Sequence, residues 1–143
     1  MDEKIAEKMI KSMSEDVGKK YSIIVKYRPP VKGNSTPENK IRKQKLKEEA
    51  TRQLDYSKPK GNNVKMKIQY YNGEGGDDVL NVEGGIADAL EGVAYDNDRQ
   101  IRSSCIDEHF LSKNPTWYKV DLEFLGLGIT SYEDDELEKL DPE

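Results

Sequence analysis

The sequence predicts one α/β (α+β) domain, built as a small mixed sheet of about four strands with two main helices in the order β-α-β-α-β-β. Three observations lead to this fold class. The length of 143 residues suits one domain. Three segments alternate apolar and polar residues as half-buried strands do, a fourth segment is also expected to be a strand, and two others place apolar residues at helical spacing. Apolar residues make up 34% of the chain and charged residues 36%, so a modest core and a heavily charged surface are expected.

The first half of the domain is expected to contain a strand, a helix and a second strand. Alternation predicts a strand over 21–28, which Pro29 and Pro30 end. A helix over 38–54 follows, with Thr36 as its N-cap and Pro37 in its first turn. Its apolar stripe is thin and consists of Ile41, Leu46, Ala50 and Leu54. Residues 64–71 alternate most clearly of all and predict the second strand.

The second half is expected to contain one helix and two strands. A glycine-rich acidic loop over 72–78 precedes a helix over 81–94, and strands follow over 101–111 and 117–125. The domain is therefore expected to span 21–131. Residues 1–20 are an N-terminal extension in which residues 1–18 have the pattern of a short helix. The acidic segment 132–143 is expected to be a disordered tail, because it offers almost no core-forming side chains.

Composition excludes several functional classes. No apolar run approaches the ~20 residues of a membrane span, and the N-terminus lacks the apolar core of a signal peptide. One cysteine, Cys105, excludes a disulfide framework, and one histidine, His109, excludes a histidine-rich metal site. A soluble cytoplasmic domain without an organic cofactor is expected. Its chemistry would use carboxylates, lysines, arginines and hydroxyls.

The net charge of −5 conceals blocks of opposite sign. Residues 21–67 carry thirteen bases and four acids, whereas residues 68–131 carry four bases and twelve acids. A basic half suits a polyanion such as DNA, and an acidic half suits a divalent cation. The alternative is that both blocks are solvated faces or that they pair with each other.

Acids gather around the predicted helix 81–94. Asp78 precedes the helix, Asp88 lies within it and Asp98 follows it. Carboxylates are the ligands that Mg²⁺ prefers, so a metal site is one interpretation. The alternative is that Asp78 caps the helix and Asp98 forms a turn. Gly84 and Gly85 cost about 1 kcal/mol each in a helix, which indicates close approach by another backbone, a second subunit or a ligand.

The segment 76–101, GDDVLNVEGGIADALEGVAYDNDRQI, resembles the RusA family of Holliday junction resolvases. The family pattern opens with Asp-x-Asp-Asn-x-x-Lys, continues with Asp-Ala-Leu and a glycine-bearing turn, and closes with an Asp-Asp pair before a strand. Asp78 and Asn81 match the opening, Asp88-Ala-Leu90 matches the centre and Asp98 matches the closing pair. The order of elements over about 21–125 also fits the family.

Three positions depart from the family pattern. Leu80 stands where the family has its second aspartate, Gly84 where it has lysine, and Asn97 where it has the first aspartate of the closing pair. The nearby acids from which a compensating carboxylate would have to come are Glu74, Asp77, Glu83 and Asp96.

The resemblance implies a structure-selective endodeoxyribonuclease that cleaves Holliday junctions or other branched DNA in recombination and repair. It implies Mg²⁺, with Mn²⁺ as an alternative ion, and a homodimer whose two sites match a two-fold junction. Asp78 and Asp98 would be catalytic, and Asp78, Asp88 and Asp98 would hold the metal. Phosphate contacts would come from Lys26, Lys32, Lys40, Arg42 and Lys43.

Two other readings remain open at this point. The departures at Leu80, Gly84 and Asn97 favour a protein that binds branched DNA without cutting it. The acidic net charge favours a protein-interaction domain that retains only the fold. Trp117 and the pair Tyr70 and Tyr71 offer rings for base stacking, although such residues in strands more often form core or cross-strand pairs.

Overall fold

The computed structural model describes residues 18–54 and 62–127. The acidic tail over 132–143 and, apart from Gly18, the helix expected over 1–18 lie outside the described residues. Strands β1 (Lys20–Val25), β2 (Asn62–Asn72), β3 (Ile101–Phe110) and β4 (Trp117–Leu127) form one sheet in the order β1-β4-β2-β3. β4 is antiparallel to both of its neighbours, β1 and β2, and β2 is parallel to the edge strand β3. The predicted mixed four-stranded sheet is confirmed.

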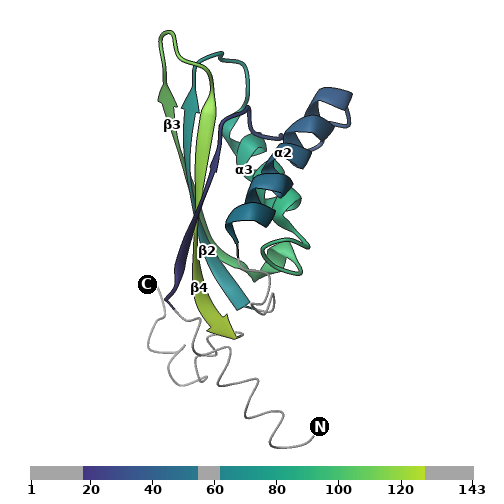
Figure 1. Ribbon diagram of the computed structural model, residues 1–143, viewed down its shortest axis with the longest axis vertical. Coiled ribbons are helices and arrows are strands. Elements are labelled where there is room, and N and C mark those ends of the chain that lie inside the picture. The colour runs from purple at the N-terminus through teal and green to yellow at the C-terminus, as the bar shows by residue number, and fades with distance from the viewer. Residues whose placement is uncertain (1–17, 55–61, 128–143) are drawn as a thin grey trace, which may run out of the picture.

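Both helices lie on the same face of this sheet (Figure 1). They are α2 (Pro37–Gln53) and α3 (Val79–Leu90), and the short 3-10 helix η1 (Asp98–Gln100) precedes β3. The core fills the space between the helices and the sheet. Its fully buried members include Leu46 from α2 and Ile86 and Leu90 from α3, packed against inward strand residues such as Ile68 and Val120. The opposite face of the sheet is not covered by either helix.

The two helices begin where the sequence predicts caps. Thr36 Oγ1 accepts a hydrogen bond from the backbone N of Asn39 at 3.3 Å, and Pro37 occupies the first turn. The end of α3 differs from the prediction, because the helix stops at Leu90 rather than at residue 94. Gly92 lies beyond that end with φ +83°, a left-handed conformation that reverses the chain and that glycine adopts without strain.

The buried face of α2 also differs from the predicted apolar stripe. Leu46 and Ala50 are buried, but Ile41 is 46% exposed. Asn39 takes a buried position instead, with 1% exposure. Its amide accepts from the backbone N of Val31 at 2.8 Å and donates to the carbonyls of Val31 at 3.0 Å and Asn34 at 2.7 Å. A polar side chain is tolerated there because these bonds satisfy it.

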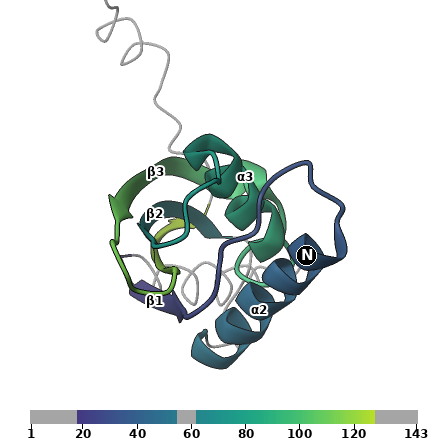
Figure 2. The same ribbon diagram turned by 90° about the horizontal axis from the view of Figure 1, so that it is seen from above.

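The segment between β1 and α2 crosses the N-terminal part of α3 (Figure 2). The backbone N of Lys32 donates to the carbonyl of Asn81 at 2.9 Å. A Cβ placed on Gly85 would lie 2.3 Å from the carbonyl oxygen of Pro30, so only glycine fits this crossing. The close approach that the glycine pair predicted is therefore made by the chain's own backbone. Along the described ranges, no helix is long and apolar enough to cross a membrane.

Candidate active site

Asp78 lies at the start of α3 and caps it. Its Oδ1 accepts a hydrogen bond from the backbone N of Leu80 at 2.8 Å. An acid in this position satisfies a free N–H group and faces the positive end of the helix dipole. The prediction that Asp78 caps this helix is thus confirmed, and the cap uses its Oδ1. Oδ2 of Asp78 makes no hydrogen bond or ion pair with any residue of the described ranges.

A cavity of about 350 Å³ lies between α3 and β3. Its charged lining consists of Lys32, Glu83 and Asp98, and the hydroxyl of Ser104 also faces it. The remaining lining residues are Met66, Leu80, Gly84, Ala87 and Ile101. Ser104 Oγ donates a hydrogen bond to Glu83 Oε2 at 2.9 Å, which holds the Glu83 carboxylate toward β3. The cavity therefore brings two carboxylates, one ammonium group and one hydroxyl together.

Lys32 reaches this cavity because Gly84 has no side chain. A Cβ on Gly84 would lie 2.9 Å from Cδ of Lys32 and 3.2 Å from its Cβ. The alkyl stem of Lys32 therefore lies directly on the surface of α3. Its ammonium group makes no ion pair with a described residue, so the charge is available to a phosphate.

Asp98 is presented by the turn that opens η1. Asn97 and Gln100 form a capping box at this turn, and the backbone N of Asp98 donates to Glu91 Oε1 at 3.3 Å. Beside it, the Tyr95 hydroxyl donates to the carbonyl of Ala87 and ties the turn to α3. Burial, followed by the negative charge of Asp98, raises the pKa of Tyr95, so this hydroxyl remains a donor. No described residue pairs with the Asp98 carboxylate.

Asp88 lies away from this cavity. Its Oδ2 is 3.7 Å from Nζ of Lys43 on α2, which places the carboxylate at the junction of the two helices. Asp78 and Asp88 do not line the cavity that contains Asp98. Within 18–54 and 62–127, no three His, Cys, Asp or Glu side chains form a group that could hold a metal ion. The three-aspartate metal site stays a prediction.

Asp77 lies in a separate ion cluster. Its Oδ2 accepts from Arg28 Nη2 at 2.7 Å and from Arg42 Nη1 at 3.4 Å. Arg28 also bonds Glu74 Oε2 at 3.2 Å. Of the four acids considered as replacements for the aspartate missing at Leu80, two are thus engaged by Arg28, while Glu83 lines the cavity together with Asp98.

The five predicted phosphate contacts differ in their availability. Lys26, Lys32 and Lys40 are exposed and make no ion pair with the described part of the chain. Arg42 is bonded to Glu38 and Asp77, and Lys43 is paired with Asp88. The sequence pattern could not make this distinction, because the pairing depends on how α2 packs against α3.

Sequence reasoning also missed the partnership between Glu83 and Ser104. The only sequence signal was the position of Glu83 among nearby acids, since Ser104 is 21 residues away and belongs to another element. The cavity, by contrast, contains one residue of each class that the motif predicted, a carboxylate at Asp98 and a cation at Lys32.

A family model described as endodeoxyribonuclease RusA matches residues 2–122. No curated protein matches the chain. RusA proteins are Holliday junction endonucleases of DNA recombination that act on branched DNA and are generally dependent on a divalent metal. The match covers most of the chain, including both helices, the cavity and all but the end of β4, and so the chain belongs to the RusA endodeoxyribonuclease family.

Proposed function

We propose that this chain cleaves Holliday junctions or related branched DNA in recombination and repair, with Mg²⁺ or Mn²⁺, as a homodimer. The observation that carries the proposal is the cavity between α3 and β3. It combines the carboxylate of Asp98 with the ammonium group of Lys32, and neither forms an ion pair within residues 18–54 and 62–127. This pairing suits a metal ion on one side and a phosphate on the other.

The carboxylates of the cavity fit a divalent ion of this kind. Mg²⁺ is usually held by one or two carboxylates, with waters and substrate phosphates completing its coordination. Asp98 and Glu83 would hold it, and Asp78, at the start of the helix that carries Glu83, would supply a further carboxylate. When bound, such an ion supplies Lewis acidity toward a phosphoryl oxygen and activates water. Asp88 is less suited because Lys43 neutralises it.

The chain's own residues would position the scissile phosphate. Lys32 would neutralise a non-bridging oxygen, since its stem is already fixed against Gly84 and its ammonium group is free. Ser104 would keep the Glu83 carboxylate oriented by its hydrogen bond. Lys26 and Lys40 would add backbone contacts that carry no sequence information.

A second candidate function is binding of branched DNA without cleavage. It is favoured by the absence of any three-carboxylate group among residues 18–54 and 62–127. It is also favoured by Leu80, which is 72% exposed at the cavity and stands where the family pattern has an aspartate. Both functions require DNA affinity, so only a cleavage assay separates them.

The experiment uses a labelled four-way junction and a linear duplex with Mg²⁺, Mn²⁺ or EDTA. Metal-dependent symmetric nicking of the junction is expected. Asp98→Asn should lower it by more than the ~10–100-fold typical of residues that only orient a metal ligand. Asp107→Asn on β3 is the matched control and should cut normally. Binding without nicking would establish the second function, and nicking in EDTA would contradict the metal requirement.

A further inference from the structure

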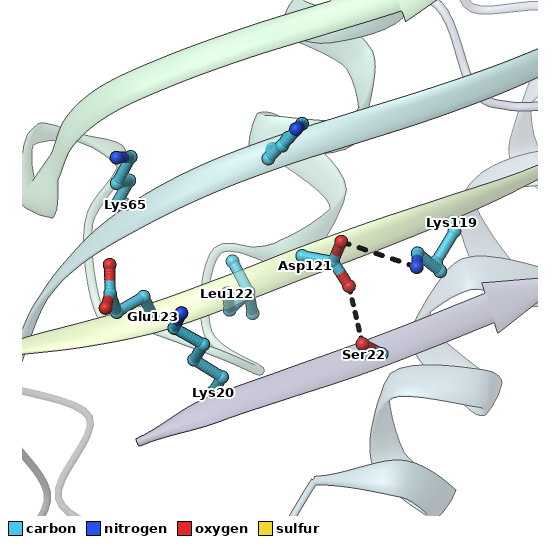
Figure 3. Close-up of a pocket in the computed structure, with 8 residues that line it drawn as sticks. Lys20, Ser22, Lys65, Lys119, Asp121, Leu122 and Glu123 are labelled. Carbon is cyan, nitrogen blue, oxygen red and sulfur yellow. Dashed lines mark hydrogen bonds and ion pairs between the residues drawn. The ribbon is translucent and has the colours of Figure 1, made fainter. Parts of the chain in front are cut away.

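The face of the sheet opposite the helices carries a concentration of lysines. Figure 3 shows this face, with side chains from β1, β2 and β4 around a shallow cavity of about 400 Å³. Four lysines and two acids line it, together with Ser22 and Leu122; the charged residues are Lys20, Lys65, Lys67, Lys119, Asp121 and Glu123. The lining thus has an excess of positive charge.

Three of these four ammonium groups form no ion pair with the part of the chain that the structure describes. Lys119 lies 3.6 Å from Asp121, which also accepts from the Ser22 hydroxyl. Lys20, Lys65 and Lys67 make no ion pair with any described residue. Glu123 is the cross-strand partner of Lys20 and Lys65, and Asp121 is that of Lys67, so the two acids offset part of the positive charge. Four lysines against two acids still leave a net positive face, which suits a polyanion.

Aromatic rings continue the same face toward the other end of the sheet. Tyr71 on β2 stacks on Trp117 of β4, with ring centroids 4.1 Å apart and planes within 10°. On its other side Tyr71 stacks on His109 of β3 at 4.9 Å. These residues are direct cross-strand partners, so the stack crosses three strands.

The free side of the Trp117 ring borders a second cavity. Because β4 lies between β2 and β1, the ring face turned away from Tyr71 is directed toward β1. The cavity there has a volume of about 510 Å³. It is lined by Trp117, Ile24, Lys26, Asn114, Pro115 and Thr116. A flat apolar wall beside a free ammonium group is the combination that binds a nucleotide, with the base on the ring and the phosphate on the lysine.

We infer that the open face of the sheet binds an unpaired DNA strand, with one base stacked on Trp117 and its backbone crossing Lys26, Lys119 and Lys67. The inference rests on DNA being the substrate, as proposed above, but not on cleavage.

Trp117 is the only tryptophan of the chain and reports on this face directly. The full chain is titrated with a thymidine oligonucleotide in the presence of EDTA, because EDTA prevents metal-dependent cleavage. Saturable quenching of Trp117 emission is expected. Each lysine that contacts a phosphate adds about 0.7 to the slope of log affinity against log salt. The double variant Lys26→Gln/Lys67→Gln should therefore lose about 1.4 of the slope, up to about 25-fold in affinity at 0.1 M salt.

Two matched variants complete the experiment. Lys47→Gln removes one charge from α2, on the helical face, and should bind like the unaltered chain. Asp98→Asn should also retain the quenching, although it abolishes the proposed cleavage. The inference is overturned if a labelled oligonucleotide binds without quenching, or if the double variant binds like Lys47→Gln. It is also overturned if emission depends only on protein concentration, which would indicate a second copy on this face. Junction cleavage with an unresponsive Trp117 would refute this inference alone and leave the proposed function standing.

Discussion

Gly85→Ala should destabilise the protein strongly, although alanine is the better helix former. The added Cβ would lie 2.3 Å from the carbonyl oxygen of Pro30 and 2.7 Å from Cα of Val31. These are backbone atoms, so no rotamer change relieves the contact. The segment between β1 and α2 would have to move away from α3 and would strain the hydrogen bond from Lys32 N to Asn81 O.

The size of the effect follows from three terms. Overpacking against a fixed backbone costs about 1–3 kcal/mol. Loss of the hydrogen bond adds about 1 kcal/mol. Replacement of glycine by alanine inside a helix returns about 1 kcal/mol. The free energy of unfolding should therefore fall by about 2 kcal/mol, which lowers Tm by roughly 7–9 °C in a domain of this size.

Gly84→Ala is the matched control on the neighbouring residue. Its added Cβ would meet only the side chain of Lys32, at 2.9 Å from Cδ. A flexible side chain can turn away, and the helix propensity gained offsets that displacement. Stability should stay within about 0.5 kcal/mol of the original, as surface substitutions usually do. Cleavage should nevertheless fall, because Lys32 is pushed from the cavity.

Thermal and urea unfolding of both variants tests this reasoning. A Tm for Gly85→Ala equal to that for Gly84→Ala would refute it, because the two positions would then be equally open. An altered urea m-value would instead reveal a change in the folded or unfolded state beyond the local contact.

Three further predictions concern the site and its surroundings. Asp77→Asn should lower the free energy of unfolding by about 1–3 kcal/mol in urea denaturation, because the carboxylate is 16% exposed and Arg28 loses its closest partner. Glu74→Gln should lower it by less than about 1 kcal/mol, because the Glu74 side chain is 47% exposed. Burial, aided by the charge of Asp77, raises the pKa of Tyr70 to about 12, so the fold favours the protonated phenol. The contribution of the Tyr70 phenol to the free energy of unfolding should be fully present below pH 10 and should be lost as the pH rises toward 12. In urea midpoints measured across this range, Tyr70→Phe should therefore flatten the decline. Asp78→Ser should keep the helix cap and the stability of the protein but lose cleavage. Asp78→Ala should lose cleavage and also about 1 kcal/mol of stability. Normal cleavage by Asp78→Ser would show that the carboxylate serves only as a cap.

The elements of the fold were predictable because each has its own local signal. Alternation over 64–71 follows from the need to bury one side of a strand, and Val64, Met66, Ile68 and Tyr70 are all buried as that pattern requires. The strand order was not predictable in this way. The last strand, β4, inserts between β1 and β2, and that choice depends on cross-strand packing between residues some 50 to 100 positions apart.

Errors at the helices have a common physical cause. The spacing of Ile41 predicts an inward apolar side chain, but the buried position is taken by Asn39, which forms hydrogen bonds with the backbone of the loop before α2. Residues 91–94 have helical spacing, but Gly92 reverses the chain there. In both cases a tertiary or conformational requirement overrides the local apolar pattern.

The candidate site was predictable in its residue types more than in its geometry. The motif identified Asp78 and Asp98, and the glycine pair correctly indicated a close approach. Which partner approaches was left open, and the chain's own Pro30 and Val31 occupy the place that a second subunit was also considered to fill. The glycine pair therefore gives no support to a homodimer, which rests on the family resemblance.

The two charge blocks of the sequence meet inside the fold and partly cancel there. Arg28 and Arg42 bind Asp77, and Lys43 binds Asp88, so these cations are engaged by acids of the same fold. The charges left over are divided between two regions. Asp98, Glu83 and Lys32 lie beside α3, where carboxylates are in excess, whereas lysines are in excess on the open face of the sheet.

This division bears on the proposed cleavage, in which carboxylates would have to approach DNA. Asp98 and Glu83 repel phosphate until a cation lies between them, so the cavity alone provides little initial affinity for DNA. Lysines on another face can hold the polyanion without neutralising those carboxylates. A net charge of −5 is therefore compatible with DNA binding, because phosphates respond to the local field of the face that they meet.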